Sequence, residues 1–588
     1  MDPINVDFGG KNVKSVEPKG STLKRVLISL VLTLVVGAVA YYFMLPALNF
    51  KAIELYVYIA VLLVAYIGIF GIVSKAYFRP EYMEYAKNKV KIPIALILVL
   101  ALVVGVGYLT GAALFRAKDY AEIIDVKEGD FTEDIAEIDF SSVPRLDKDS
   151  SNMLATRALG KLSDYVSQFT VNSYYSTQIN YKGTPVRVQS LDYGDVFKWL
   201  KNTKEGIPAY IIVDMTTEKA ETVRLDEGMK YSPAEHFNEY LIRHVRFKYP
   251  SLILDEPSFE IDDNGSPYWI VPVLDKTIGL FGGTDVIGAV IVDSITGDTT
   301  LVSTSLDGTT KLPTDKFVTD KEFQWLDQVY SATIVNEQYN YYGKYNNGFW
   351  NSIIGQENVR VTSSGYNYLA LNDDVYMYTG VTSVSSDQSI IGFVLINQRT
   401  KEASYYQQAG ALEETARTSA QGKVQQYSYT ATFPLLLNIG NEPTYFMALK
   451  DKSNIVQQYA LVNVNQFTTI ISTGTSIQAC LESYTKILAD NGIKTDIDVE
   501  NVVDPNAQGG EQTPVETKSV AGAIEDIRVA VIGGNSVYYL RVAGSDKYFA
   551  VDASDFATVI IANKGNAVEI EYKDSDKAII DADSFVLK

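Results

Sequence analysis

Residues 26–45 read VLISLVLTLVVGAVAYYFML, an apolar run without a charged side chain. Two similar runs follow, IELYVYIAVLLVAYIGIFGIV at residues 53–73 and IPIALILVLALVVGVGYLTGAALF at residues 92–115. As a helix, a run of about 20 residues crosses roughly 30 Å of hydrocarbon. The sequence therefore predicts an anchor of three transmembrane helices within residues 26–118, in contact with the lipid bilayer.

Basic residues flank the three runs unevenly. The first loop holds one, Lys51, whereas the tail 1–25 and the second loop each hold five: Lys11, Lys14, Lys19, Lys24 and Arg25, then Lys75, Arg79, Lys87, Lys89 and Lys91. Basic residues favour the cytoplasmic side. We therefore expect a multi-pass plasma-membrane protein with a cytoplasmic tail and a large C-terminal domain outside. Arg116 and Lys118 oppose this orientation, and a two-span alternative would place the domain in the cytoplasm.

The first run has an alternative interpretation as a secretory signal. Ala38-Val39-Ala40 has the small-x-small form of a signal-peptidase site. The tail before the run is long, however, and the run continues past the alanines, which favours an uncleaved anchor. The large domain lies outside under either interpretation.

Charge and cysteine content limit the class of the large domain. Residues 1–118 carry a net charge of +7, so the remainder carries −27 of the total of −20. Such acidity argues against nucleic acid as a partner, because phosphates need Lys and Arg. The single cysteine, Cys480, permits no intrachain disulfide and lies on the apolar face of a predicted helix, 477–490. A large external domain without disulfides favours a Gram-positive surface.

Two glycines mark the third run as a packing surface. Gly107 and Gly111 form a GxxxG pattern, which permits close helix contact within the anchor or a homo-oligomer through this helix. None of the runs carries a basic or acidic residue at its middle. Transport usually needs buried ionisable groups, so transport by this chain alone is not expected.

Composition divides the rest of the chain. Residues 119–150 are acidic and predict an irregular stalk, and residues 500–518 are polar and rich in Gly and Pro, which predicts a linker. Two α+β modules are expected at 151–310 and 311–499. Residues 519–588 contain short strands separated by turn residues, which predicts a small β-barrel.

A strand–turn–strand pattern recurs within the two modules. An apolar strand ends in Asp or Asn and a polar turn at four places, 210–214, 289–293, 393–397 and 460–463. Asp and Asn suit such turns, so we expect β-hairpins. Helices are predicted between them, one of them opening at Ser232-Pro-Ala-Glu235 and carrying His236 and His244. The fold class is thus an anchor plus an extracytoplasmic α+β ectodomain of repeated helix/β-hairpin modules and a small barrel.

The helix, extended strand and hairpin of residues 232–302 resemble the PepSY domain, a small α+β unit of envelope and secreted proteins. Residues 145–490 also resemble an uncharacterised family of Gram-positive membrane-anchored proteins. The segments that carry this resemblance include INYKGTPVRV, KTIGLFGGTDVIGAV, YYGKYNNGFWNSIIGQ and FPLLLNIGNEPTYFMALKD. The resemblance implies an architecture and leaves the activity open.

Searches for catalytic and metal-binding patterns select no residue. HExxH, CxxC and Walker motifs are missing from the sequence. The two histidines lie two helical turns apart on the predicted helix, too far to share a metal. Asp262-Asp263-Asn264-Gly265 is interpreted as a hairpin turn, because the Glu that ends a calcium loop is missing. We therefore expect no cofactor, no metal and no assigned catalytic residue.

Glycine and aromatic residues are the candidates for binding. Phe281, Gly282 and Gly283 lie in a Gly-rich loop where a partner backbone could approach closely. Residues 339–350 read YNYYGKYNNGFW, and such side chains are favoured at protein and sugar interfaces. The predicted contacts from this segment are Tyr341, Tyr342, Tyr345, Phe349 and Trp350.

These expectations combine into one hypothesis of function. The domain would bind another envelope protein, a peptide or a wall polymer, in a structural or regulatory role. A carboxylate-dependent cell-wall hydrolase, or an accessory subunit of a membrane transport or secretion complex, are the alternatives.

Overall fold

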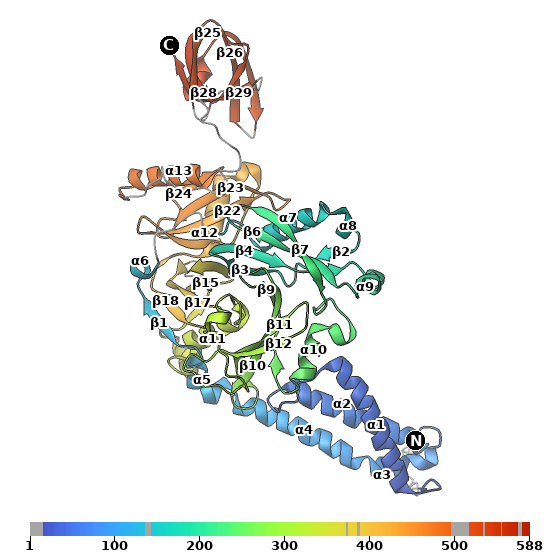
Figure 1. Ribbon diagram of the computed structural model, residues 1–588. Coiled ribbons are helices and arrows are strands. Elements are labelled where there is room, and N and C mark those ends of the chain that lie inside the picture. The colour runs from blue at the N-terminus through green and yellow to red at the C-terminus, as the bar shows by residue number, and fades with distance from the viewer. Residues whose placement is uncertain are drawn as a thin grey trace, which may run out of the picture. The chain divides into compact units, whose positions relative to one another are not determined.

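The computed structural model describes residues 16–135, 143–371, 374–384, 389–495, 517–532, 535–553, 556–573 and 579–588 (Figure 1). The chain forms two compact units. The first comprises Met1–Ala416, Phe433–Tyr445 and Asn463–Phe467, and the second comprises Arg417–Thr432, Phe446–Val462 and Thr468–Lys588. The predicted linker 500–518 lies largely outside the described residues.

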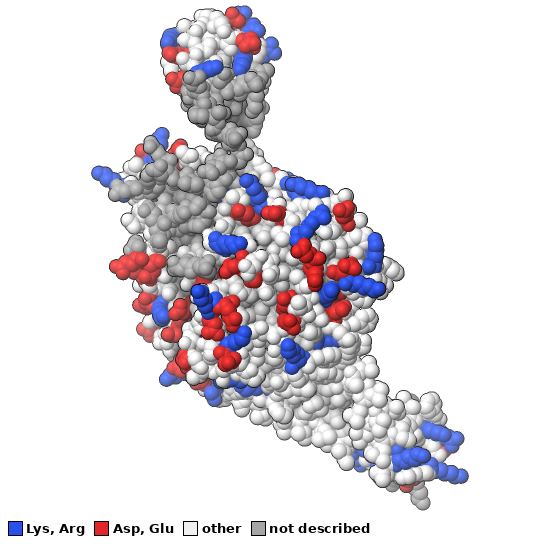
Figure 2. Space-filling model, viewed as in Figure 1, with Lys and Arg blue, Asp and Glu red and all other residues white. Residues whose placement is uncertain are grey.

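Three helices near the N-terminus are long and apolar enough to cross a membrane: α1 (Thr22–Met44), α2 (Ile53–Val73) and α4 (Lys91–Thr110). This confirms the predicted anchor, although the third helix ends at Thr110. Ala112 is extended and starts a separate helix, α5 (Ala113–Ala121). Figure 2 shows the helices as a band without charge, with Lys and Arg gathered at the end where α3 (Met83–Lys89) lies.

Several sheets build the rest of the first unit, which is a large α+β region. One has the strand order β3 (Thr177–Tyr181), β4 (Thr184–Gln189), β6 (Ile207–Asp214) and β7 (Lys219–Met229). The helix α7 (Lys148–Gly160) contacts it at β6 and β7. A second sheet has the order β12 (Thr299–Ser303), β11 (Gly282–Asp293), β10 (Pro267–Ile278) and β8 (Ile253–Leu254), and β9 (Ser258–Ile261) also pairs with β10.

A third sheet shares a hydrophobic core with the second. Its order is β1 (Val126–Gly129), β18 (Ala403–Tyr406), β17 (Gly392–Asn397), β15 (Asp374–Ser383) and β13 (Arg360–Thr362), with β14 (Asn367–Leu371) beside β15. Ile270 of the second sheet and Ile396 of the third belong to one buried cluster, together with Val335 of α11 (Ala332–Tyr345). Burial of this cluster holds the two sheets and the helix together.

The prediction of an irregular stalk at 119–150 is wrong for part of that segment. Residues Val126–Gly129 form β1, which pairs in parallel with Ala403–Tyr406 of β18. Its acidic composition gives no local signal of a strand, and its pairing partner lies far away in the sequence. The chain therefore runs from α4 through α5 directly into a sheet.

The four predicted hairpins are antiparallel strand pairs: β6–β7, β11–β12, β17–β18 and β23 (Val456–Asn463) with β24 (Ile471–Gly474). The turn at Asp262 is also confirmed, because its carboxylate accepts the backbone N–H groups of Asn264 and Ser266.

The helix predicted to open at Ser232 is wrong in its start. Helix α10 covers Leu241–Lys248, so His244 is helical and His236 is not. Tertiary bonds decide this, since the Glu235 carboxylate accepts from Tyr193 Oη at 2.5 Å and from Trp199 Nε1 at 2.8 Å. The segment before α10 is thereby held in a turn.

The second unit contains a sheet and a barrel. The sheet pairs β20 (Thr430–Ala431), the end of β22 (Glu442–Lys450), β23 and β24, and α13 (Ile477–Asp490) contacts β24. Cys480 lies on α13, 1% exposed, and burial raises its thiol pKa to about 12. The strands β25 (Thr517–Ile532), β26 (Asn535–Val542), β27 (Tyr548–Asp552), β29 (Ile579–Leu587) and β28 (Ala567–Lys573) pair in that order into a closed barrel.

Candidate functional site at the membrane end of the domain

Helix α10 provides hydrogen-bond donors to the C-terminal end of the first membrane helix. The last carbonyls of a helix have no partner within the helix, and α1 has no basic residue in its own last turn. Arg243 Nε donates to Tyr42 O at 3.0 Å, and Arg246 Nε donates to Leu45 O at 3.1 Å. Both arginines are more than 90% buried. Two cations thus lie at the negative end of the α1 dipole.

The loop between α1 and α2 is bound to the same region. Leu48 N donates to Pro250 O at 2.7 Å. The ammonium of Lys51 lies 2.7 Å from the Asp275 carboxylate of β10 and donates to Lys276 O at 2.6 Å. Lys51 is the one basic residue of that short loop. Its ion pair with Asp275 joins the loop to the second sheet.

The third membrane helix contacts the tip of the β10–β11 hairpin. A Cβ atom placed on Gly107 would come within 2.5 Å of Phe281 Cε2, and one placed on Gly111 would lie 3.3 Å from Gly282 N. A larger residue at Gly107 would require the Phe281 ring to shift, and one at Gly111 would require the hairpin backbone to yield by a few tenths of an ångström. The small-residue face of the predicted GxxxG pattern is therefore covered by this hairpin.

Phe281 fills the space between two membrane helices. Its ring lies 5.6 Å from the ring of Tyr56 on α2 and 5.1 Å from that of Tyr108 on α4, and only 9% of the residue is exposed. Gly283, with φ +64°, provides the left-handed backbone that the tip needs. The structure thus brings together Gly107, Gly111, Phe281, Gly282 and Gly283, and the closely approaching backbone belongs to the same chain.

The aromatic segment lies beside the same junction. Tyr120 of α5 donates its hydroxyl to Gly111 O at 2.8 Å, and its ring lies 4.8 Å from Tyr341 and 6.3 Å from Tyr345. Phe349 stacks on Tyr345 at 6.3 Å. Of the five predicted contact residues, Trp350 alone is largely exposed, at 65%.

Tyr342 has a different environment from the rest of the aromatic segment. The guanidinium of Arg360 lies 5.5 Å from its ring.

Most of the aromatic segment thus packs within the first unit, which leaves Trp350 as the side chain most available to a partner.

A cavity of about 530 Å³ opens along the edge of β11 and β12. Hydroxyl groups make up much of its wall, and two lysines, Lys311 and Lys401, complete it together with Asp285. The hydroxyl residues are Ser303, Thr304, Ser305, Thr309, Thr310 and Thr400, and Tyr330 also lines the cavity. Such a lining offers many hydrogen-bond donors and acceptors to a polar ligand.

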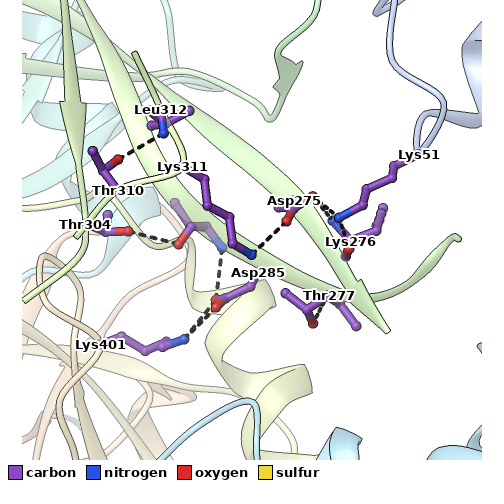
Figure 3. A network of polar contacts seen from close by, with 12 residues as sticks. Lys51, Asp275, Lys276, Thr277, Asp285, Thr304, Thr310, Lys311, Leu312 and Lys401 are labelled. Atoms are coloured by element: carbon purple, nitrogen blue, oxygen red, sulfur yellow. Dashed lines mark hydrogen bonds and ion pairs between the residues drawn. The ribbon is translucent and has the colours of Figure 1, made fainter. Parts of the chain in front are cut away.

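Ion pairs connect the cavity to the membrane helices (Figure 3). Asp275 lies between Lys51 and Lys311, at 2.7 and 3.4 Å. Lys401 binds both oxygens of Asp285 at 2.9 Å and donates to Ile123 O, which follows α5, at 3.1 Å. Lys401 thus contacts the segment after α5 directly. Lys311 reaches the α1–α2 loop through Asp275.

The two lysines differ in how firmly they are held. Lys401 and Asp285 are 17% and 18% exposed, so their ion pair is shielded from solvent. Lys311 is 73% exposed and meets Asp275 at a longer distance, so it can turn toward a ligand at little cost.

The buried carboxylate of Glu260 and the two histidines do not form a site. Glu260 is fully buried, which keeps it from substrate, and burial raises its pKa to about 7. His236 packs against Trp199, and His244 bonds to Gly297 O at 2.7 Å. Within the described ranges, no three His, Cys, Asp or Glu side chains gather as metal ligands would.

Sequence reasoning missed the charged residues of the junction and of the cavity. Arg243, Lys51, Asp275, Lys311 and Lys401 come from separate segments, and none belongs to a recognisable motif. Only the isolation of Lys51 in its loop was a local signal. No protein-family model matches the chain, and no curated protein matches it either.

Proposed function

We propose that this chain is a multi-pass plasma-membrane protein whose large domain lies outside the cell and binds another component of the envelope. That component is a protein, a peptide or a wall polymer. The gathering of Lys and Arg at the α3 end of the helices supports the orientation, because that end favours the cytoplasm (Figure 2). The domain then lies at the opposite, external end.

The observation that carries the proposal is the cavity beside β11 and β12. Its hydroxyl-rich wall and its exposed Lys311 suit a ligand with a carboxylate or phosphate group and several polar atoms. Peptide termini and anionic wall polymers carry these groups. Through Asp275 and Lys51, such a ligand would also influence the loop between two membrane helices.

We also propose that the domain is built from repeated units. The four hairpins would be copies of one PepSY-like module, as in envelope proteins of Gram-positive bacteria. The C-terminal barrel would serve as a second binding module, and exposed Trp350 would add a contact.

Binding by the full-length protein in lipid nanodiscs tests the function. We expect retention of a labelled wall-polymer fragment or of a labelled peptide with a free C-terminal carboxylate. Lys311→Met should reduce retention about tenfold, because it removes one charge-assisted bond. Lys316→Met is the matched control, since the side chain of Lys316 is also partly exposed, at 43%, but does not line the cavity.

Two outcomes would contradict the proposal. One is that neither probe binds the wild-type protein above background. The other is that Lys311→Met and Lys316→Met bind the probe equally, which would place recognition elsewhere.

A further inference from the structure

A second cavity, of about 400 Å³, lies where the first membrane helix ends. Its walls come from the last turn of α1, from the turn that precedes α10 and from α10 itself. The lining residues include Tyr42, Phe43, Glu235, His236, Phe237 and Arg243. Because α1 is long and apolar enough to cross a membrane, the cavity lies at the depth where hydrocarbon gives way to headgroups.

Phe237 is held in an unfavourable conformation at the mouth of this cavity. Its φ is +51°, in the left-handed region that a bulky residue rarely adopts. Arg243 donates to Phe237 O, which helps to hold this backbone in place. The result is a phenyl ring that is 64% exposed, on the same cavity as Phe43, which is 70% exposed. Such strain persists where the surrounding structure enforces it, and it often marks a ligand site.

The exposed rings have an apolar neighbour in the bilayer. Phe43 belongs to the last turn of a membrane-spanning helix, so lipid surrounds it when the protein is inserted. The ring of Phe247, on α10, lies 6.2 Å from that of Tyr41 and is stacked on it. Aromatic side chains are favoured at this depth of a membrane. The cavity is therefore continuous with the lipid-facing surface of α1.

A cation, Arg243, also lines the cavity. The Arg243 guanidinium lies 4.1 Å from the ring of Tyr42, and its hydrogen bonds go to the carbonyls of Tyr42 and Phe237. Among the residues that the structure describes, no carboxylate pairs with it. The nearby Glu235 carboxylate accepts hydrogen bonds from Tyr193 and Trp199 instead. The positive charge of Arg243 is thus available to an anion.

We propose that this cavity binds one phospholipid molecule from the adjacent leaflet. An acyl chain would lie against Phe43 and Phe237, and the phosphate would lie at Arg243, with His236 beside it. The cavity unites an apolar wall open to the bilayer with a buried cation, and a phospholipid matches both. The bound lipid would then hold the domain against the membrane surface.

The full-length protein, purified in mild detergent and analysed by native mass spectrometry, tests this site. We expect one phosphatidylglycerol molecule to remain bound to the wild type after delipidation. Phe237→Gly should reduce the bound fraction about tenfold, because it removes the ring. Glycine readily adopts φ +51°, so this variant should fold at least as well as the wild type.

Two controls separate the cavity from the membrane surface in general. Phe50→Ala removes a phenylalanine that is 75% exposed in the α1–α2 loop but does not line the cavity, so the lipid should remain. Diacylglycerol, which lacks phosphate, should bind at least about tenfold more weakly than phosphatidylglycerol.

Three results would overturn the proposal. They are full retention of the lipid by Phe237→Gly, an equal loss of lipid from Phe50→Ala, and binding of diacylglycerol as tight as that of phosphatidylglycerol.

Discussion

At the scale of single residues, Gly107 and Phe281 form a close contact between a membrane helix and the strand-rich domain. The absence of a side chain at Gly107 admits the ring of Phe281. That ring reaches Tyr56 and Tyr108, so one phenylalanine joins two membrane helices to a hairpin.

A larger residue at Gly107 should weaken this junction. We expect Gly107→Val to lower the free energy of unfolding by about 1–3 kcal/mol through overpacking against Phe281. Part of that loss should disappear in the Phe281→Ala background, with a coupling of about 1 kcal/mol. Chemical unfolding in detergent measures both. Gly105→Val is the matched control, because a Cβ there meets nothing within 4 Å; equal losses at both glycines would disprove the contact.

Glu260 should give the domain a characteristic dependence of stability on pH. Its carboxylate accepts N–H bonds from Asp327 and Gln328 at 2.9 Å, yet burial raises its pKa from 4.5 to about 7. A raised pKa means that the folded state binds the proton more tightly than the unfolded state. The stabilising contribution is therefore complete below pH 4.5 and is lost as pH rises through about 7.

Glu260→Gln cannot take up this proton. The difference in unfolding free energy between wild type and Glu260→Gln should change by up to about 3 kcal/mol across that pH range. Denaturant titrations at several pH values measure it, with exposed Glu227→Gln as the control. A difference that is constant with pH would show that Glu260 does not titrate in this range.

At the scale of elements, α10 and α1 complete each other. α1 ends without a basic residue in its last turn, and α10 provides Arg243 and Arg246 to its final carbonyls. Arg246 also donates to Pro250 O and Leu252 O, so it orders the loop after its own helix. The domain therefore stabilises the end of a helix that is long and apolar enough to cross a membrane.

Loss of the cap should destabilise the junction. We expect Arg246→Met to lower the free energy of unfolding by about 3 kcal/mol, because several buried carbonyls lose a charged donor. Lys248→Met, an exposed cation on the same helix, should change it by less than about 1 kcal/mol. Thermal unfolding of the full-length protein in detergent compares the two. Equal effects would mean that the cap contributes nothing.

At the scale of the whole molecule, several contacts join the anchor to the rest of the first unit. They include those at the end of α1, at the loop that holds Lys51, and at the end of α4. The segment after α4 then enters the third sheet as β1.

The orientation of the whole molecule can be tested with engineered cysteines. The one native cysteine, Cys480, is buried, and its thiol pKa is raised to about 12, so it should not react in the folded protein. We expect a membrane-impermeant maleimide to label Lys204→Cys, an exposed site of the large domain, on intact cells. Lys87→Cys, between the second and third membrane helices, should react only after permeabilisation. The reverse pattern would place the domain in the cytoplasm.

The membrane helices and the hairpins were predictable because their signals are local. An apolar run is long enough to span a bilayer whatever follows it, and Asp or Asn after a strand favours a turn. Helix 477–490 was predicted with the bounds that the structure shows. The start of α10 and the strand β1 were missed, because Tyr193, Trp199 and Ala403, far away in the sequence, decide them.

Three apolar helices, an acidic α+β region and a set of residues suited to close contact follow from the order of the amino acids alone. What those residues contact depends on how the chain folds. Gly107 and Phe281, predicted as separate surfaces, meet each other, and lysines from distant segments line one cavity. The physical reason is that composition and periodicity act over a few residues. Ion pairs and ring contacts depend on which sheets and helices pack together.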